Sequence, residues 1–147
     1  MTRKETFEWL DRYRLAKKAE TEIELEIEML ENEYMIPAKR MDGMPRGSGG
    51  KDLASFAAQF DKLHRKLLRQ KAKRLRIQEE ITQAIETAPI TDRERAMLRY
   101  HYILFFKWED SFEAVGVERS WGYRLRNKAI KSLDIKSDFK RQEKMQQ

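Results

Sequence analysis

Side chains that can bind nucleic acid are concentrated near the end of the chain, between residues 119 and 133. Arginine can bind guanine through two hydrogen bonds and asparagine can bind adenine, whereas Lys, Ser and Tyr can hold phosphates. At helical spacing they lie largely outward, opposite an apolar face of Leu125, Ala129 and Leu133. An ordinary solvated amphipathic helix is the alternative interpretation. The candidate DNA-binding residues are Arg119, Ser120, Tyr123, Arg124, Asn127, Lys128 and Lys131.

The residues before this segment follow the order of a helix-turn-helix. Thr91 and Glu94 fit a reciprocal capping box at the start of one helix. Residues 108–114 fit a second, short helix, and Val115-Gly116-Val117 forms a tight turn before the basic helix. Such a turn lets the following helix lie in the major groove of DNA. This order favours DNA binding over the solvated-surface interpretation.

No other group of residues predicts a catalytic or metal site. The chain contains no Cys and two His, His64 and His101, so a zinc finger is excluded. Neighbouring acids such as Glu109-Asp110 point about 100° apart on a helix, which favours solvated surface over paired catalytic carboxylates. We therefore expect no enzyme activity, no cofactor and no metal.

Charge is distributed unevenly along the 147 residues, whose net charge is +6. Residues 1–50 carry 9 basic and 11 acidic side chains, residues 51–90 carry 9 and 5, and residues 91–147 carry 13 and 9. Positive charge in the second and third segments suits a partner that bears phosphates. With 38% charged and 40% hydrophobic residues, the composition disfavours a compact α/β core and suits long helices.

Two long helices are predicted before the helix-turn-helix. The first, from about Thr6 to Tyr34, has a heptad-like apolar seam interrupted by Glu20, and ends at Ile36-Pro37. The second runs from about Lys51 to Thr87, and its seam includes the polar residues Gln70 and Arg74, where we expect weaker apolar contact. Folded back on each other, the helices form an antiparallel, coiled-coil-like hairpin.

A basic run at 62–76 contains no acid, whereas seven Glu and no Lys or Arg lie between Glu20 and Glu33. The run could bind DNA phosphates, contact RNA polymerase or balance the Glu-rich helix, and charge balance is favoured. The predicted fold is therefore all-α, with a helical hairpin at 1–90, a helix-turn-helix domain at 91–135 and a flexible tail at 136–147. A Gly/Pro-rich loop at 37–50 joins the two long helices.

The segment from Asp92 to Leu133 resembles region 4, the promoter-binding region of bacterial sigma factors. Together with the hairpin and the loop, nearly the whole chain resembles a family of small phage and prophage proteins of Gram-positive bacteria, grouped with late-gene transcription regulators of the RinA and ArpU type. The matching residues are Asp92-Arg93-Glu94-Arg95, Leu98-Arg99-Tyr100, Trp108-Glu109-Asp110, Gly116-Val117, Tyr123-Arg124-Leu125 and Lys128-Ala129, and in the loop Gly43-Met44-Pro45-Arg46-Gly47-Ser48-Gly49-Gly50.

Three positions depart from the sigma-like pattern. Glu118 replaces the usual Ser or Thr cap, and Gly122 stands where an aliphatic core residue is usual. Ser111-Phe112 stands where an aliphatic residue followed by Ala is expected. We expect these changes to weaken DNA binding by the isolated domain, and Gly122→Val to strengthen it.

The resemblance implies a regulator of phage late or packaging genes in the cytoplasm of a bacterial host. Its partners would be double-stranded DNA and, through the hairpin, a second copy or RNA polymerase, with no membrane involved. No apolar run approaches the roughly 20 residues that cross a bilayer. Two alternatives remain: a module that binds polymerase without reading DNA, and a DNA-packaging component similar to a small terminase subunit.

Overall fold

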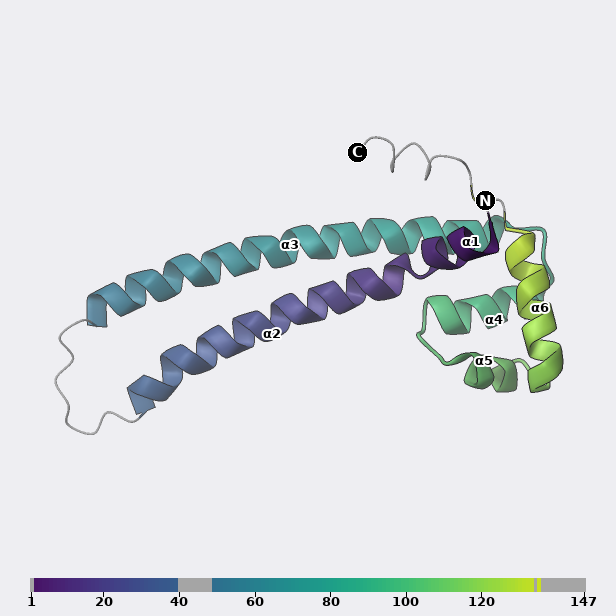
Figure 1. The fold of residues 1–147 in the computed structure, drawn as a ribbon. Helices are drawn as coiled ribbons and strands as arrows, with labels where there is room; N and C mark the ends of the chain where they lie inside the picture. Colours follow the sequence, from purple (N-terminus) through teal and green to yellow (C-terminus); the bar gives the residue numbers. More distant parts are fainter. Residues whose placement is uncertain (1, 40–48, 134, 136–147) are drawn as a thin grey trace. The chain divides into compact units, whose positions relative to one another are not determined.

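The computed structural model describes residues 2–39, 49–133 and 135, and within them all side chains except those of 35–39 and 49–52. The elements of this part of the chain are helical, which confirms the all-α class (Figure 1). Residues 40–48 of the predicted loop and the predicted tail at 136–147 lie outside the described residues. The helices are α1 (Arg3–Leu10), α2 (Arg12–Lys39), α3 (Gly49–Thr87), α4 (Asp92–Tyr102), α5 (Trp108–Ala114) and α6 (Arg119–Lys131).

The predicted first helix is two helices, so that prediction is corrected. Thr2 and Glu5 form a reciprocal capping box at the start of α1, with both side-chain bonds to backbone N–H groups at 3.2 Å. Asp11 caps the end of α1, and its carboxylate accepts a hydrogen bond from Arg14 Nε at 2.9 Å. At its other end α2 continues two residues beyond Pro37. A proline removes one intrahelical hydrogen bond, a loss that the last turn of a helix tolerates better than its middle.

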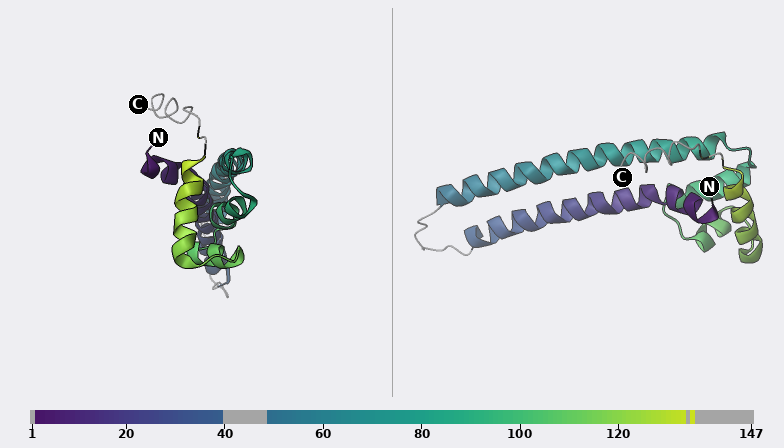
Figure 2. Two further views of the ribbon diagram at one scale, coloured as in Figure 1. Left: turned by 90° about the vertical axis from the view of Figure 1, so that its right-hand side faces the viewer. Right: turned by 45° about the horizontal axis from the view of Figure 1, so that its top comes forward.

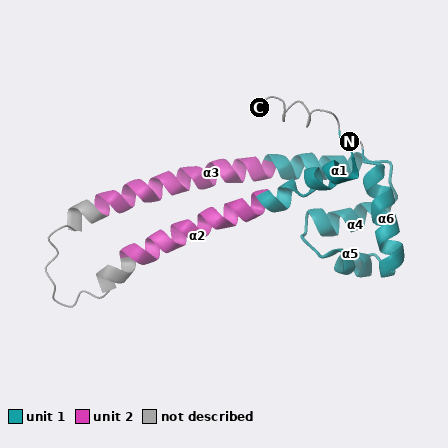
Figure 3. Cartoon of the chain, viewed as in Figure 1, with its two compact units in different colours: residues 1–15, 76–147 teal, residues 16–75 magenta. Residues whose placement is uncertain are grey.

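The chain divides into two compact units (Figure 3). Unit 1 comprises residues 1–15 and 76–147, and unit 2 comprises residues 16–75. This division differs from the predicted boundary after residue 90, because α1 and the last turns of α3 pack with α4, α5 and α6. A fragment of residues 91–147 would therefore lack packing partners, so DNA binding by that fragment would not by itself reveal the role of the hairpin.

In unit 2, α2 and α3 lie side by side and run in opposite directions (Figure 1; Figure 2, right). Ile23 and Ile27 of α2 are buried against Leu67 of α3, with Phe60 and Leu63 packed on the same cluster. These residues belong to the seams predicted from heptad spacing. Burial of this apolar stripe is the main force that holds two such helices together.

A polar layer follows this apolar cluster in unit 2. Arg74 forms an ion pair with Glu20, whose side chain is only 2% exposed, and Lys17 approaches the same carboxylate at 3.6 Å. Gln70 Nε2 donates a hydrogen bond to the Ala16 carbonyl at 3.0 Å. The polar seam residues, which we expected to weaken the contact, therefore join the two helices through one ion pair and one hydrogen bond to the backbone.

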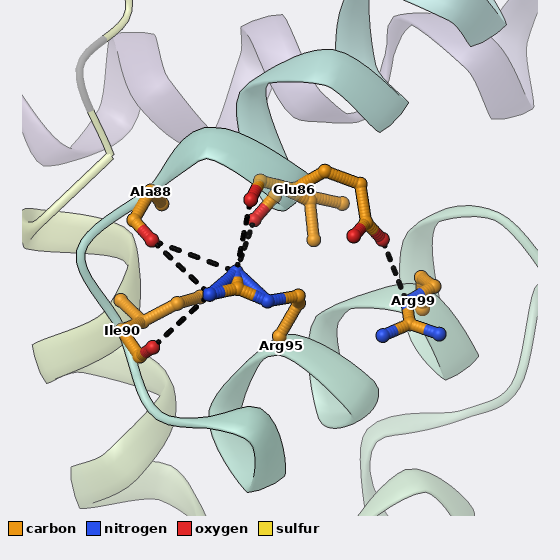
Figure 4. Close-up of polar contacts among 6 residues, drawn as sticks. Glu86, Ala88, Ile90, Arg95 and Arg99 are labelled. Carbon is orange, nitrogen blue, oxygen red and sulfur yellow. Dashed lines mark hydrogen bonds and ion pairs between the residues drawn. The ribbon is translucent and has the colours of Figure 1, made fainter.

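In unit 1, α4 is fastened to the end of α3 by Arg95 (Figure 4). Its guanidinium donates hydrogen bonds of 3.0–3.3 Å to the carbonyls of Ile85, Glu86, Ala88 and Ile90. The last carbonyls of a helix lack intrahelical donors, so a planar cation with five N–H groups can satisfy several of them at once. The fully buried side chains of unit 1 include Leu10, Ile81, Ile85, Met97, Leu98 and Phe112.

Candidate nucleic-acid interface

The backbone of the turn between α5 and α6 requires a glycine. Gly116 has φ +72°, a left-handed conformation that costs an L side chain energy. The following Val117 N–H donates to the Phe112 carbonyl at 2.9 Å, which folds the chain back onto α5. Glu118 then occupies the N-cap position of α6 without making a side-chain cap bond. The helix therefore begins without the side-chain acceptor that Ser or Thr would supply.

Gly122 is explained by packing, which removes the reason for our expectation that Gly122→Val strengthens DNA binding. A Cβ atom at this position would lie 2.5–2.7 Å from Cγ, Cδ1 and Cδ2 of the Phe112 ring. Phe112 is 1% exposed, so its ring fills the space that an aliphatic side chain at 122 would otherwise take. The two departures from the sigma-like pattern, at 112 and 122, therefore compensate each other in volume.

The outward face of α6 is basic and carries an exposed tryptophan. Trp121 is 52% exposed and precedes Arg124 and Lys128 by one and two helical turns. Among the described residues, Arg124 and Lys131 have no ion-pair partner. Sequence reasoning missed Trp121, because its i, i+4, i+8 spacing with Leu125 and Ala129 places it close to the apolar side of the helix. The exposed residues of this face are Ser120, Trp121, Arg124, Lys128 and Lys131.

Arg119 and Tyr123 both reach Glu109 of α5. The Tyr123 hydroxyl donates to Glu109 Oε1 at 2.8 Å, and Arg119 approaches the same oxygen at 3.7 Å. The pKa of the Glu109 carboxyl is lowered, mainly by a hydrogen bond from the Glu109 backbone and secondly by the hydrogen bond from Tyr123. The carboxyl is therefore ionised at neutral pH. Tyr123 also meets the Phe112 ring edge-on and is only half-exposed. We expected Tyr123 to point outward, but its main contacts are with α5, and it holds α6 against that helix.

Asn127 is turned toward Arg126. Its Oδ1 accepts hydrogen bonds from Arg126 Nε and an Arg126 terminal nitrogen at 3.1 and 3.0 Å. The Arg126 guanidinium lies among the rings of Phe7, Trp108 and Tyr123, 4.9–5.3 Å from their centres. Such cation–π contacts hold the cation in place. Asn127 would have to release Arg126 before its oxygen could accept a hydrogen bond from adenine.

Lys128 has an internal partner. Its Nζ lies 4.0 Å from Glu94 Oε1, and the Glu94 side chain is 3% exposed. Thr91 Oγ1 accepts from the Glu94 N–H at 3.2 Å as predicted, but the reciprocal half of the predicted capping box is absent in α4. A buried carboxylate favours a nearby cation, so Lys128 both reaches solvent and balances charge within the fold.

The helix α1 adds a residue that sequence spacing could not reveal. A groove between α1 and α6 is lined by Arg3 and Thr6 on one side and by Asn127, Ile130 and Lys131 on the other. Arg3 is therefore placed beside the end of α6 that carries Lys131. More than one hundred residues separate the two cations in sequence, and only tertiary packing brings them to one groove.

Comparison of the chain with protein-family models, with curated proteins and with solved structures finds no match. In the described residues, none of the helices is both long and apolar enough to cross a bilayer. The same residues contain no group of three or more acids and histidines placed to hold a metal ion.

Proposed function

We propose that this chain is a sequence-specific DNA-binding transcription regulator of phage or prophage late genes, acting in the cytoplasm of a bacterial host. In this proposal α5, the turn and α6 form a helix-turn-helix similar to sigma factor region 4, and α2 and α3 form a hairpin that contacts a protein partner. One observation carries the proposal: α6 has five basic residues and no acid, and its outward face is exposed. A helix of this kind can enter the major groove without repelling phosphates.

The geometry suggests a division of roles along α6. Arg124 is exposed and central on the outward face, so it is our first candidate for bidentate contact with guanine. Trp121 adds an apolar surface one turn earlier, which suits contact with thymine methyl groups. Lys131 and Arg3, which line one groove, suit phosphate contacts.

We expect Arg124→Ala to weaken binding to a selected DNA site by about 1–3 kcal/mol and to relax preference at one base pair. Lys131→Ala should weaken binding to all sequences alike and reduce the slope of log affinity against log salt by about 1. The site would come from in vitro selection with full-length protein, followed by fluorescence anisotropy at several salt concentrations. Arg93→Ala, at an exposed position of α4, is the matched control and should leave sequence preference intact. Unchanged preference in Arg124→Ala would contradict the assigned role.

We expect Glu109→Gln to strengthen DNA binding. The substitution removes a carboxylate beside α6 and frees Arg119 for a phosphate, while the Gln oxygen can still accept the Tyr123 hydrogen bond. The salt slope should become steeper by about 1, because one more cation is available. Asp110→Asn, on the same exposed first turn of α5, is the control for general charge. An equal gain from both variants would mean that Arg119 gains no specific contact.

A second candidate function is a module that binds RNA polymerase or another protein without reading DNA. It is favoured by Leu104, Phe105 and Phe106, which are 40–56% exposed between α4 and α5. Phe105 has φ 62° and its ring stacks on Tyr13 at 5.0 Å, so the loop is held in a costly conformation. Exposed adjacent apolar side chains often mark a protein contact. Failure of the selection to enrich any DNA sequence would favour this candidate.

A further inference from the structure

The two helices of unit 2 carry opposite charge. Residues 16–34 on α2 contain seven Glu and two Lys, whereas residues 53–75 on α3 contain seven Lys or Arg and one Asp. Only one ion pair, Glu20–Arg74, joins the two helices within the described part of this unit. Most of these charges therefore face solvent and remain free to meet another molecule.

Each helix also exposes large apolar side chains outside its contact with the partner helix. On α2, Leu25 and Met29 are 52% and 62% exposed and lie one turn apart. On α3, Leu68 and Leu75 are 67% and 55% exposed and lie two turns apart. Residues at these spacings share one side of a helix, so each pair forms a short apolar stripe. Two such stripes in one small unit exceed the scattered exposure that soluble proteins usually show.

The charges next to the two stripes are complementary. Glu22 and Glu28 lie beside the Leu25 stripe, and Arg65 and Arg69 lie beside Leu68, all of them exposed. Arg65 bonds Asp61 of its own helix at 3.1 Å, an exposed pair that holds it only weakly. The apolar stripe on α2 is thus flanked by acidic residues, and the apolar stripe on α3 is flanked by basic residues.

We propose that a second copy of this chain docks on these faces, with the stripe of Leu25 and Met29 on α2 in one copy against the stripe of Leu68 and Leu75 on α3 in the next. Contact of α2 with α2, or of α3 with α3, would bring like charges together and is disfavoured. Two copies can use both faces at once in a twofold pair, in which α2 meets α3 twice, or they can meet head-to-tail at a single contact, which leaves one free face of each kind. Repetition of such a contact produces either a closed ring or an open filament. This inference does not depend on DNA binding.

The test is sedimentation velocity of full-length protein, without DNA, at low and high salt. Wild-type protein should sediment as more than one chain at low salt and shift toward one chain as salt rises. One variant, Glu22→Lys with Glu28→Lys, makes the α2 face basic; the other, Arg65→Glu with Arg69→Glu, makes the α3 face acidic. Each variant alone should sediment as a single chain, because its two faces then repel. An equimolar mixture should recover the larger species, because each variant supplies the face that the other lacks.

The matched control is Glu24→Lys with Glu31→Lys, which makes the same charge change on the flank of α2 rather than at the two acids beside the Leu25 stripe. It should sediment as wild type, and circular dichroism should show unchanged helix content in every variant. A further variant, Leu25→Gln with Met29→Gln, should dissociate at low salt although its charge is unchanged. A wild-type protein that is one chain at all salt concentrations overturns the proposal, as does a mixture that fails to recover the larger species.

Discussion

Arg74→Leu is expected to lower the free energy of unfolding by about 3–5 kcal/mol, because it leaves a buried carboxylate without its main partner. Glu20 is 2% exposed in the interface of α2 and α3, and after the substitution only Lys17, at 3.6 Å, remains near it. The cost of an uncompensated buried charge far exceeds the apolar contact that leucine would add. Urea denaturation of the full-length chain, followed by circular dichroism, measures the effect.

The double variant Glu20→Leu with Arg74→Leu tests whether the loss comes from the unpaired carboxylate. Replacing both members of a buried ion pair by apolar residues is often neutral or stabilising, so the double variant should regain most of the loss. Arg76→Leu, at an exposed position two residues along α3, should change stability by no more than about 0.5 kcal/mol. If Arg74→Leu were as stable as the double variant, the pair would have no role in holding the helices together.

Gly122→Ala is expected to destabilise the protein by about 1–3 kcal/mol, the usual cost of overpacking a core. Alanine favours a helix over glycine by about 1 kcal/mol, so propensity alone predicts the opposite sign. Packing decides, because the added Cβ would lie 2.5 Å from the Phe112 ring. That ring is itself confined between Trp108 and Tyr123, with ring centres 6.0 and 4.9 Å away. Thermal unfolding of full-length protein followed by circular dichroism gives the sign directly.

A double-mutant cycle separates packing from a general weakness of α6. Phe112→Ala alone should cost about 3–5 kcal/mol through the cavity it leaves. Combined with Gly122→Val, it exchanges the large and the small side chain between positions 112 and 122, and the pair should be more stable than the sum of its singles by about 0.5–3 kcal/mol. Strict additivity, or a Gly122→Ala variant that melts higher than wild type, would show that the two residues are not coupled.

The sequence by itself determined the helical class and most helix positions. Heptad spacing of Ile23, Ile27 and Leu67 is a local property of each helix, and it identified the seam before any contact was known. Turn chemistry is similarly local. Gly116 marked the turn between α5 and α6, and among the described residues it is the glycine with a positive φ. The outward position of Arg124 followed from the 3.6-residue period alone. Its role in DNA binding stays a prediction.

Only tertiary structure decided which residues meet across long sequence distances. Gly122 appeared to be a defect of α6 until the Phe112 ring was seen to occupy its side-chain space. Glu20 and Arg74 appeared to interrupt two separate seams until they were found to form one buried pair. In the same way Arg95, one of several arginines in a charged segment, was found to satisfy the carbonyls at the end of α3. Volume and charge compensation depend on pairs of residues, and a pattern within one helix reports only on its own residues.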